Sequence, residues 1–425
     1  MMEALVKAAR KASFRTAVIE TEVKNRALLK IAEALQARRS EIEAANDEDM
    51  RRAAADKLTP ALVDRLRLDG HKIDSLVTGL KSLAELQDPV GAVQLKRELD
   101  TGLVLERIAV PIGVIGVIFE ARPEAFIQIA ALCIKSGNAV ILKGGKEATS
   151  SVRLLNEIVN DALAATDSRF ESAVQSVASR EEVNALLKFD RYIDLMIPRG
   201  SNRLVRSIIE NTKIPVLGHA DGLCHTYVDA DADIAKAVRV VTDAKCQYPA
   251  ACNATETVLV HSRIAPAFLP ALKAALDGKV ELRGCPETLK LISVNPASDD
   301  DWDEEYNDLI LSIKIVALAE EAIEFINRHG SRHTDAILTE NSETAALFLR
   351  KVDSASVYHN CSTRFADGFR YGFGAEVGIS THKIHARGPV GLEGLTIYKY
   401  LLHGDGQIVG DYVSGKSSFH YKDLK

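Results

Sequence analysis

The stretch KCQYPAACNATETVLVH, residues 245–261, places Cys246 and Cys252 just before an apolar run. Cys252 lies among small side chains, because two alanines precede it and Asn253 follows it, whereas Cys246 lacks that clearance. A thiolate can attack an activated carbonyl carbon and hold the acyl group as a thioester, which a hydride then reduces. Unreactive core cysteines are also common. The segment alone therefore shifts the balance only modestly toward a nucleophile at Cys252, and a packing role stays the commoner one for a free cysteine.

A second candidate is the stretch NAVILKGGKEATSS, where an apolar run ends at Lys143 and two glycines precede Lys146 and a helical pattern. Ligands of open α/β sheets bind beyond the carboxyl ends of the strands, and a cation beside free amides suits ribose hydroxyls or a 2′-phosphate. A tight turn with solvated lysines produces the same pattern. Both interpretations stay open from these residues alone.

The third candidate is MIPRGSNRLVRSI, in which Gly200 and Ser201 lie between a strand pattern and a helix pattern, beside Arg199. Free amides at the start of a helix attract pyrophosphate. The segment is not the GxGxxG fingerprint, and an ordinary helix cap by Ser201 explains it equally well.

These residues need a scaffold, and the apolar spacing indicates one. Helical periodicity runs from Glu3 to about Leu86, and an alternating pattern around the turn DTG predicts a hairpin. From Gly113 onward, short apolar runs alternate with helical stretches, which predicts an α/β fold with a doubly wound parallel sheet. A second alternating series follows a boundary that we place near Asp243.

The chain therefore divides into five predicted segments. The final segment carries an exposed strand that we expect to pair with the hairpin of another subunit. The segments are a helical part of the cofactor domain at 1–95, an oligomerisation hairpin at 96–110, a dinucleotide-binding domain at 111–243, a catalytic domain at 244–390, and a C-terminal return with the oligomerisation strand at 391–425.

The bulk composition excludes several classes of protein. With 47% apolar and 26% charged residues the chain is typical of a soluble globular protein, and a net charge of −6 gives no nucleic-acid footprint. No run is long enough for a membrane span and no secretory leader is evident, and the scattered cysteines suit a reducing compartment, so we expect a cytoplasmic protein. His382 and His385 have no acidic or cysteine partner at ligand spacing, so we expect no metal site.

Two long motifs point to a family. VALAEEAIEFINRHGSRHTDAILT (316–339) and GAEVGISTHKIHARGPVGLEGLTIYKY (374–400) resemble signatures of the aldehyde dehydrogenase superfamily and, within it, of the gamma-glutamyl phosphate reductases. The resemblance covers essentially the whole chain. It implies an aldehyde dehydrogenase-like fold with a parallel-sheet cofactor domain, a second α/β catalytic domain and a β-hairpin oligomerisation extension. Phe325 departs from the signature, which usually has histidine there, and we expect it to have a packing role.

The resemblance also implies roles for individual residues. Arg364 would bind the α-carboxylate of the substrate through its planar fork, although a surface or interdomain ion pair explains that residue equally well. The implied assignments are Cys252 as the nucleophile, Lys143 at the adenosine ribose, Gly200 and Ser201 at the pyrophosphate, Glu305 at the nicotinamide ribose, and Asn360 and Arg364 at the substrate.

Two family residues are missing. His219 stands roughly where hydrolytic members carry a water-activating glutamate, and Ala121 stands where they carry an oxyanion-holding asparagine. Both losses suit an acyl phosphate, because phosphate leaves without a general base and a thioester must survive until hydride arrives.

The resemblance implies an enzyme that reduces L-glutamyl 5-phosphate to L-glutamate 5-semialdehyde in proline biosynthesis, with the acyl phosphate handed over by a glutamate 5-kinase. The implied cofactor is NADPH/NADP, since Lys143 and Lys146 favour a 2′-phosphate by charge, although NADH is not excluded. A homodimer or homotetramer is expected. The alternatives are another acylating member, such as an acyl-CoA reductase, and a non-catalytic protein on the same fold.

Overall fold

The computed structural model describes residues 2–218 and 221–425. The chain divides into two compact units, a first unit of Met1–Val216, Phe373–Val377 and Val390–Lys425, and a second unit of Leu217–Gly372 and Gly378–Pro389. The two units are described separately below. None of the helices in the described part is long and apolar enough to cross a membrane.

The first unit begins with a layer of helices whose apolar faces are buried. Leu28, Ile31 and Leu35 repeat at helical spacing and are almost fully buried, which is why the second helix packs against its neighbours. The helices are α1 (Met2–Thr16), α2 (Thr21–Ala37), α3 (Arg39–Ala55), α4 (Pro60–Leu66) and α5 (Gly70–Glu85).

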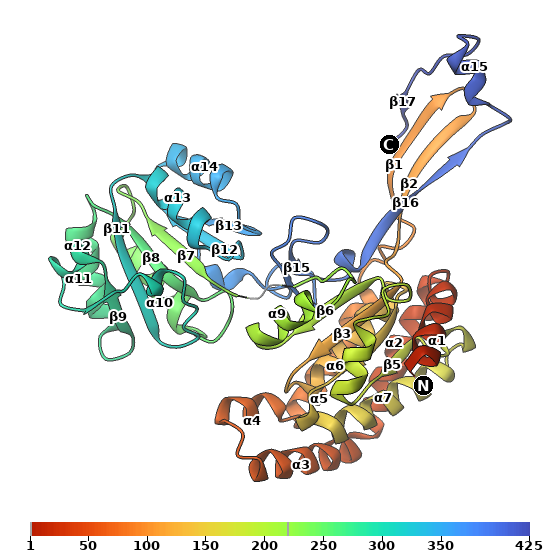
Figure 1. The fold of residues 1–425 in the computed structure, drawn as a ribbon, viewed down its shortest axis with the longest axis horizontal. Coiled ribbons are helices and arrows are strands. Elements are labelled where there is room, and N and C mark those ends of the chain that lie inside the picture. Colours follow the sequence, from red (N-terminus) through yellow and green to blue (C-terminus); the bar gives the residue numbers. More distant parts are fainter. Residues whose placement is uncertain (1, 219–220) are drawn as a thin grey trace. The chain divides into compact units, whose positions relative to one another are not determined.

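The parallel sheet of the first unit has the order β5-β4-β3-β6. Its central strand β3 is buried along its whole length, as a strand covered on both faces must be. The register places the ends of β3, β4 and β6 at one edge of the sheet. The strands are β3 (Val114–Phe119), β4 (Ala139–Lys143), β5 (Val174–Ser176) and β6 (Leu195–Arg199), and the helices among them are α6 (Pro123–Lys135), α7 (Thr149–Ala164), α8 (Arg180–Leu186) and α9 (Asn202–Glu210) (Figure 1).

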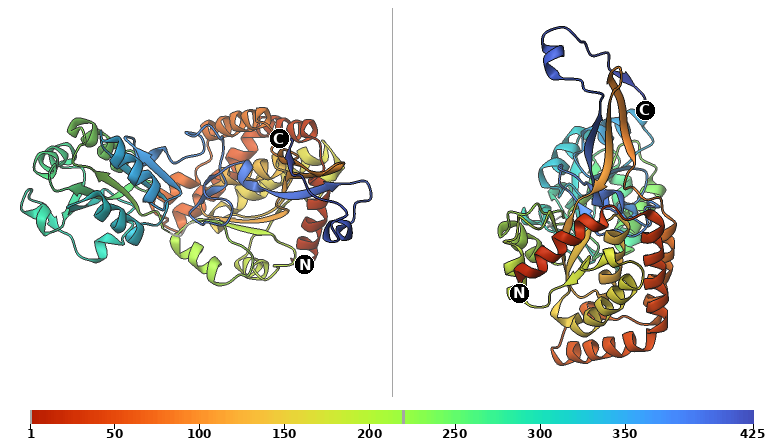
Figure 2. Two further views of the ribbon diagram at one scale, coloured as in Figure 1. Left: turned by 90° about the horizontal axis from the view of Figure 1, so that it is seen from above. Right: turned by 90° about the vertical axis from the view of Figure 1, so that its right-hand side faces the viewer.

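An antiparallel sheet extends from the first unit, as Figures 1 and 2 show. It contains the hairpin β1 (Val93–Asp100) and β2 (Leu103–Pro111), with β16 (Thr396–His403) beside β2 and the short β17 (Lys422–Asp423) beside β1. The C-terminal strand was expected to pair with the hairpin of another subunit; within the chain it pairs with its own hairpin, and pairing across subunits stays a prediction. The chain returns so that Thr396 faces Pro111, and β16 then runs along β2 of its own chain.

The second unit is built on a seven-stranded sheet with the order β10-β9-β11-β8-β7-β12-β13, whose strand pairs are parallel. Helices α10 (Ile234–Cys246) and α11 (Ala265–Leu276) form one core with the sheet, and α13 (Ala319–His329) and α14 (Ser342–Lys351) contribute to another. The strands are β7 (Cys224–Val228), β8 (Thr255–His261), β9 (Glu281–Gly284), β10 (Asn295–Pro296), β11 (Ile310–Val316), β12 (Thr334–Leu338) and β13 (Ser356–His359).

The predicted α/β architecture is confirmed, but the predicted boundary near Asp243 is wrong. The units divide between Val216 and Leu217, because β7 pairs with β8 and β12 of the second sheet. In the described part of residues 214–222, Val216 forms an isolated bridge with Met196. Phe325 packs against the second core, as predicted.

Candidate active site

Cys252 lies in the loop between α10 and β8, which we call the nucleophile loop (residues 247–254). The amide of Ala254 donates to the carbonyl of Ala251 at 2.8 Å, so the chain turns tightly around the cysteine. Cys252 is half-buried, whereas Cys133, Cys224 and Cys285 are buried. The thiol therefore retains the accessibility that a nucleophile needs.

Gly222 presses directly against this loop. A Cβ built on Gly222 would lie 2.3 Å from the carbonyl oxygen of Cys252 and 2.4 Å from its Cα. The thiol of Cys224 also donates to that carbonyl, at 3.3 Å. Glycine is needed here because of this close approach. Sequence reasoning missed Gly222, and its only signal was a glycine shortly before the CHTYV strand.

The close approach gives a first prediction. Gly222→Ala is expected to push the Cys252 backbone from its position and to lower kcat about 10²-fold, since an error of about 1 Å in a reacting group costs that much. Steady-state kinetics check this, together with a thermal unfolding curve. Gly278→Ala is a control, because no atom lies near the Cβ it would add, although its positive φ leaves some strain. Unchanged kcat in folded Gly222→Ala would refute the steric role.

Arg364 is brought to the nucleophile loop by the 3-10 turn η4 (Thr363–Phe365). The hydroxyls of Thr255 and Thr363 lie 3.2 Å apart, which ties η4 to the start of β8. Arg364 Nε donates to Gln247 Oε1 at 2.9 Å, and its guanidinium carbon lies 5.8 Å from the ring centre of Tyr248. The bond uses Nε, so the outer nitrogens of the fork are the ones that suit a carboxylate.

The electrostatics couple Arg364 to the thiol. Burial lowers the pKa of Arg364, and the charge of Arg370 acts in the same direction, whereas the charge of Cys252 as a thiolate opposes this lowering. Because a charge–charge interaction is mutual, a thiolate at Cys252 would be attracted by the Arg364 guanidinium.

Glu305 lies half-buried in the connection between η3 (Asp300–Trp302) and β11. Its charge acts on Glu256, whose pKa is raised to about 8, mainly by burial and against the attraction of Lys245. The structure therefore brings Glu305 within electrostatic reach of the residues that flank the nucleophile loop.

Asn360 uses its side chain for the backbone. The Asn360 amide accepts a hydrogen bond from the nitrogen of Thr339 at 3.0 Å and donates to its carbonyl at 2.9 Å. The residue has a left-handed φ of 56°, which asparagine tolerates. These bonds fix the turn after β13, so the role of Asn360 near the substrate stays a prediction.

In the first unit, Lys143 ends β4, and Gly200 and Ser201 lie between β6 and α9. The amide of Ser201 donates to the carboxylate of Glu120 at 2.8 Å, and a Cβ on Gly200 would strike the same carboxylate at 2.4 Å. This amide thus already binds an anionic oxygen. It is the type of donor that a pyrophosphate oxygen requires.

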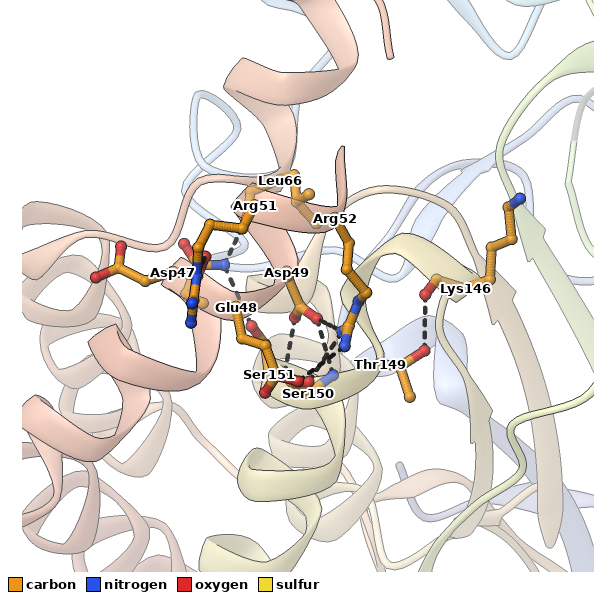
Figure 3. Close-up of polar contacts among 11 residues, drawn as sticks. Asp47, Glu48, Asp49, Arg51, Arg52, Leu66, Lys146, Thr149, Ser150 and Ser151 are labelled. Atoms are coloured by element: carbon orange, nitrogen blue, oxygen red, sulfur yellow. Dashed lines mark hydrogen bonds and ion pairs between the residues drawn. The ribbon is translucent and has the colours of Figure 1, made fainter. Parts of the chain in front are cut away.

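The start of α7 is satisfied from within the chain. Figure 3 shows the buried carboxylate of Asp49 facing the amides of Ser150 and Ser151, at 3.0 and 2.8 Å, with Arg52 also in contact with it. The ammonium of Lys146 points away from this cluster. An anionic ligand at this edge would therefore meet the lysines and not the amides of α7.

Comparison with known proteins shows the family to which this chain belongs. The sequence model of the aldehyde dehydrogenase family matches residues 1–282. A gamma-glutamyl phosphate reductase of Acetivibrio thermocellus is 55% identical, over 98% of this chain and 96% of that protein. The crystal structure of a gamma-glutamyl phosphate reductase from Thermotoga maritima superimposes with a TM-score of 0.94 at 41% identity, over 96% of this chain and 99% of that one.

The chain belongs to the gamma-glutamyl phosphate reductases of the aldehyde dehydrogenase family. It is an oxidoreductase, as the predicted resemblance implied. An engineered glycolyl-CoA reductase with bound NADP+ shares the fold at 16% identity and a TM-score of 0.65, over 94% of this chain and 96% of that one. The fold is therefore shared with a protein whose sequence differs at most positions.

Of the two positions where a catalytic side chain of the family was predicted to be missing, Ala121 is described in the structure and His219 lies outside the described residues. Ala121 is buried in a left-handed turn with φ 43°, and its amide donates to Glu147 Oε1 at 2.6 Å. An alanine side chain offers no hydrogen-bond donor, so Ala121 cannot do the work of the family asparagine.

The described residues also include two half-buried thiols, Cys246 and Cys361, and two exposed histidines, His382 and His385. Burial raises the pKa of Cys246 and of Cys361, which disfavours their reactive thiolates. Lys383 lies between these histidines and Arg387 follows them, and the two cations pair with Asp353 at 2.6 and 3.2 Å. In the described ranges, no three His, Cys, Asp or Glu side chains are grouped to hold a metal ion.

Proposed function

We propose that this enzyme reduces L-glutamyl 5-phosphate to L-glutamate 5-semialdehyde with release of phosphate, through a thioester on Cys252 and with NADPH as the reductant. One observation carries the proposal. The half-buried thiol of Cys252 shares its loop with Gln247, which fixes a buried guanidinium at Arg364. In this proposal the Cys252 thiol would attack the acyl phosphate of the substrate, and the Arg364 guanidinium would bind its α-carboxylate. The names of the relatives agree with this substrate.

The proposed reaction uses two side chains, those of Cys252 and Arg364. The Cys252 thiolate attacks the acyl carbon of the substrate, the bond from that carbon to the phosphate oxygen breaks, and phosphate leaves with the electron pair. When bound, the reduced nicotinamide supplies a hydride. Expulsion of the aldehyde returns the sulfur as thiolate, with Arg364 stabilising its charge and orienting the substrate through the α-carboxylate.

The residues of the first unit fit a dinucleotide. The Ser201 amide holds an anionic oxygen, Gly200 leaves room beside it, and Lys143 supplies a cation at the neighbouring strand end. In this proposal Gly200 and Ser201 would hold the pyrophosphate, Lys143 the adenosine ribose, and Glu305 of the second unit the nicotinamide ribose. Lys146 is exposed close to Lys143 in the chain and would favour the 2′-phosphate of NADPH.

The proposed cofactor preference gives a second prediction. Lys146→Glu is expected to lower kcat/KM for NADPH about 10- to 100-fold, the worth of one hydrogen bond to a charged group, and to leave the value for NADH within about twofold. Initial rates with both cofactors check this. Lys11→Glu is a matched control, because Lys11 is also an exposed lysine of the first unit. Equal losses with NADPH and NADH would contradict a 2′-phosphate contact.

The decisive test of the function is an assay of NADPH oxidation with enzymatically generated glutamyl phosphate, and of semialdehyde oxidation that depends on phosphate. We expect turnover in both directions. Turnover of a CoA thioester at a comparable rate, with none of glutamyl phosphate, would instead support an acyl-CoA reductase. Because acyl phosphates are short-lived in water, we also propose that a glutamate 5-kinase supplies the substrate by hand-over.

We further propose that the enzyme forms a homodimer or homotetramer through the extended sheet. Along β16, Ile397, Tyr398, Tyr400 and Leu402 are exposed, and such a row of apolar side chains is typical of an interface. Light scattering during gel filtration measures the mass in solution, and a monomer at micromolar concentration would refute this part of the proposal.

A further inference from the structure

The stems of the nucleophile loop carry a pair of buried charges that the chemistry above does not use. Lys245 lies in the last turn of α10 and Glu256 is the second residue of β8, so the two residues flank the loop of Cys252. Lys245 Nζ donates to Glu256 Oε2 at 2.5 Å, and the side chains are 0% and 1% exposed. The ion pair therefore spans the base of the loop.

Other side-chain contacts hold single points of this loop. Asn253 Nδ2 donates to the carbonyl of Ala366 at 2.8 Å, and Gln247 accepts from Arg364. The Cys224 thiol also donates to the carbonyl of Cys252 at 3.3 Å, and short-range backbone hydrogen bonds add to these contacts, such as that from Ala251 to the carbonyl of Tyr248 at 3.2 Å. These bonds shape the loop locally, whereas the ion pair sets the distance between its two ends.

The surroundings of the pair connect it to the predicted cofactor segment. Lys245 Nζ lies 6.0 Å from the ring centre of Tyr306, and the charge of the neighbouring Glu305 raises the pKa of Glu256 further. Lys245 thus lies near Tyr306, and Glu256 interacts electrostatically with Glu305, so the pair at the ends of the nucleophile loop also interacts with the connection before β11.

A role in stability alone does not account for such a pair. Taking two charges out of water costs free energy that their attraction often fails to recover, so that apolar residues of similar size are frequently as stable or more so. A buried pair with good geometry can, however, fix one arrangement of the backbone against others. That effect matters most where a reacting atom must be held to within a fraction of an ångström.

We propose that Lys245 and Glu256 are positioning residues, which hold the nucleophile loop so that Cys252 presents its sulfur to the substrate and remains in register with the segment of Glu305. The inference rests on the proposed role of Cys252 as the nucleophile. It extends that role to two residues that touch neither substrate nor cofactor.

The test compares two double variants. Lys245→Met with Glu256→Leu fills the space without charges, and we expect a folded protein whose kcat is at least tenfold lower and whose Cys252 is alkylated by iodoacetamide at least tenfold more slowly. Lys245→Gln with Glu256→Gln keeps a hydrogen bond between the stems, and we expect it to recover part of both rates. A purely structural pair would change the unfolding temperature without changing the alkylation rate.

The matched control is a second deeply buried lysine–carboxylate pair, Lys24 with Asp88 in the first unit. Lys24→Met with Asp88→Leu is expected to keep kcat and the alkylation rate within about twofold. Wild-type rates in the folded Met and Leu variant would overturn the inference. If that Met and Leu variant does not fold, the inference is overturned when the two-glutamine variant and a Glu256→Leu single variant are both alkylated at Cys252 at the wild-type rate. Failure of the proposed nucleophile shows separately, as activity retained by Cys252→Ala.

Discussion

Cys252→Ala is expected to lower kcat by at least about 10⁴-fold, the scale of loss when an enzyme is deprived of its attacking group. The physical reason is that no thioester can form without the sulfur, so the acyl carbon is never held for reduction. Initial rates of NADPH oxidation measure the effect. Mass spectrometry after incubation with substrate, at low cofactor concentration, shows whether the acyl group is on the protein.

The controls for this result are the two other half-buried cysteines. Cys246→Ala and Cys361→Ala are expected to keep kcat within about threefold, because burial raises the pKa of both thiols and disfavours the thiolate. Near-normal turnover by Cys252→Ala, or a loss equally large for Cys246→Ala, would refute the assignment of the nucleophile.

Arg364→Met is expected to lower kcat/KM for the glutamyl substrate about 10³-fold. A buried guanidinium that meets a carboxylate contributes roughly 2–5 kcal/mol when one partner is removed. Arg364→Lys keeps the charge but not the planar fork, so we expect an intermediate loss of about 10²-fold. Kinetics with an aldehyde of similar length that lacks the α-carboxylate separate recognition of the substrate from support of the thiolate.

Arg263→Met is the matched control for Arg364. Arg263 belongs to the same unit, is 70% exposed and lies 3.6 Å from Asp231 in a surface ion pair, so its loss is expected to change kcat/KM less than twofold. If Arg364→Met lowered the rate equally for the glutamyl substrate and for the simple aldehyde, its role would be confined to the thiol.

The sequence predicts the elements of this fold better than their partners. The patterns of β3, β4 and β6 were recognisable because buried strands are short, apolar and flanked by helical spacing. The strand at Cys224–Val228 reads in the same way, yet it belongs to the second sheet, where it pairs with β8 and β12. A local pattern shows that a strand is buried, but only contacts distant in sequence decide which sheet contains it.

The candidate site follows the same rule. Cys252 was recognisable from its small neighbours and the family resemblance, since both lie in the local sequence. Gly222 and Lys245 were not, because the role of each is a contact with a residue from another part of the fold. Asn360 shows the converse, since a residue carried over from the resemblance turns out to bond the backbone of Thr339.

The carboxylate of Glu120 on the Ser201 amide has a consequence for how the first unit binds an anionic ligand. The Glu120 carboxylate competes for that amide, so a phosphate oxygen that binds there must first displace the carboxylate. The observed dissociation constant is then the intrinsic one divided by the fraction of molecules in which the carboxylate has swung away. Ligand binding at the Ser201 amide would then exchange the Glu120 carboxylate for a phosphate oxygen. The amide at the start of α9 would have an anionic partner both with and without the ligand.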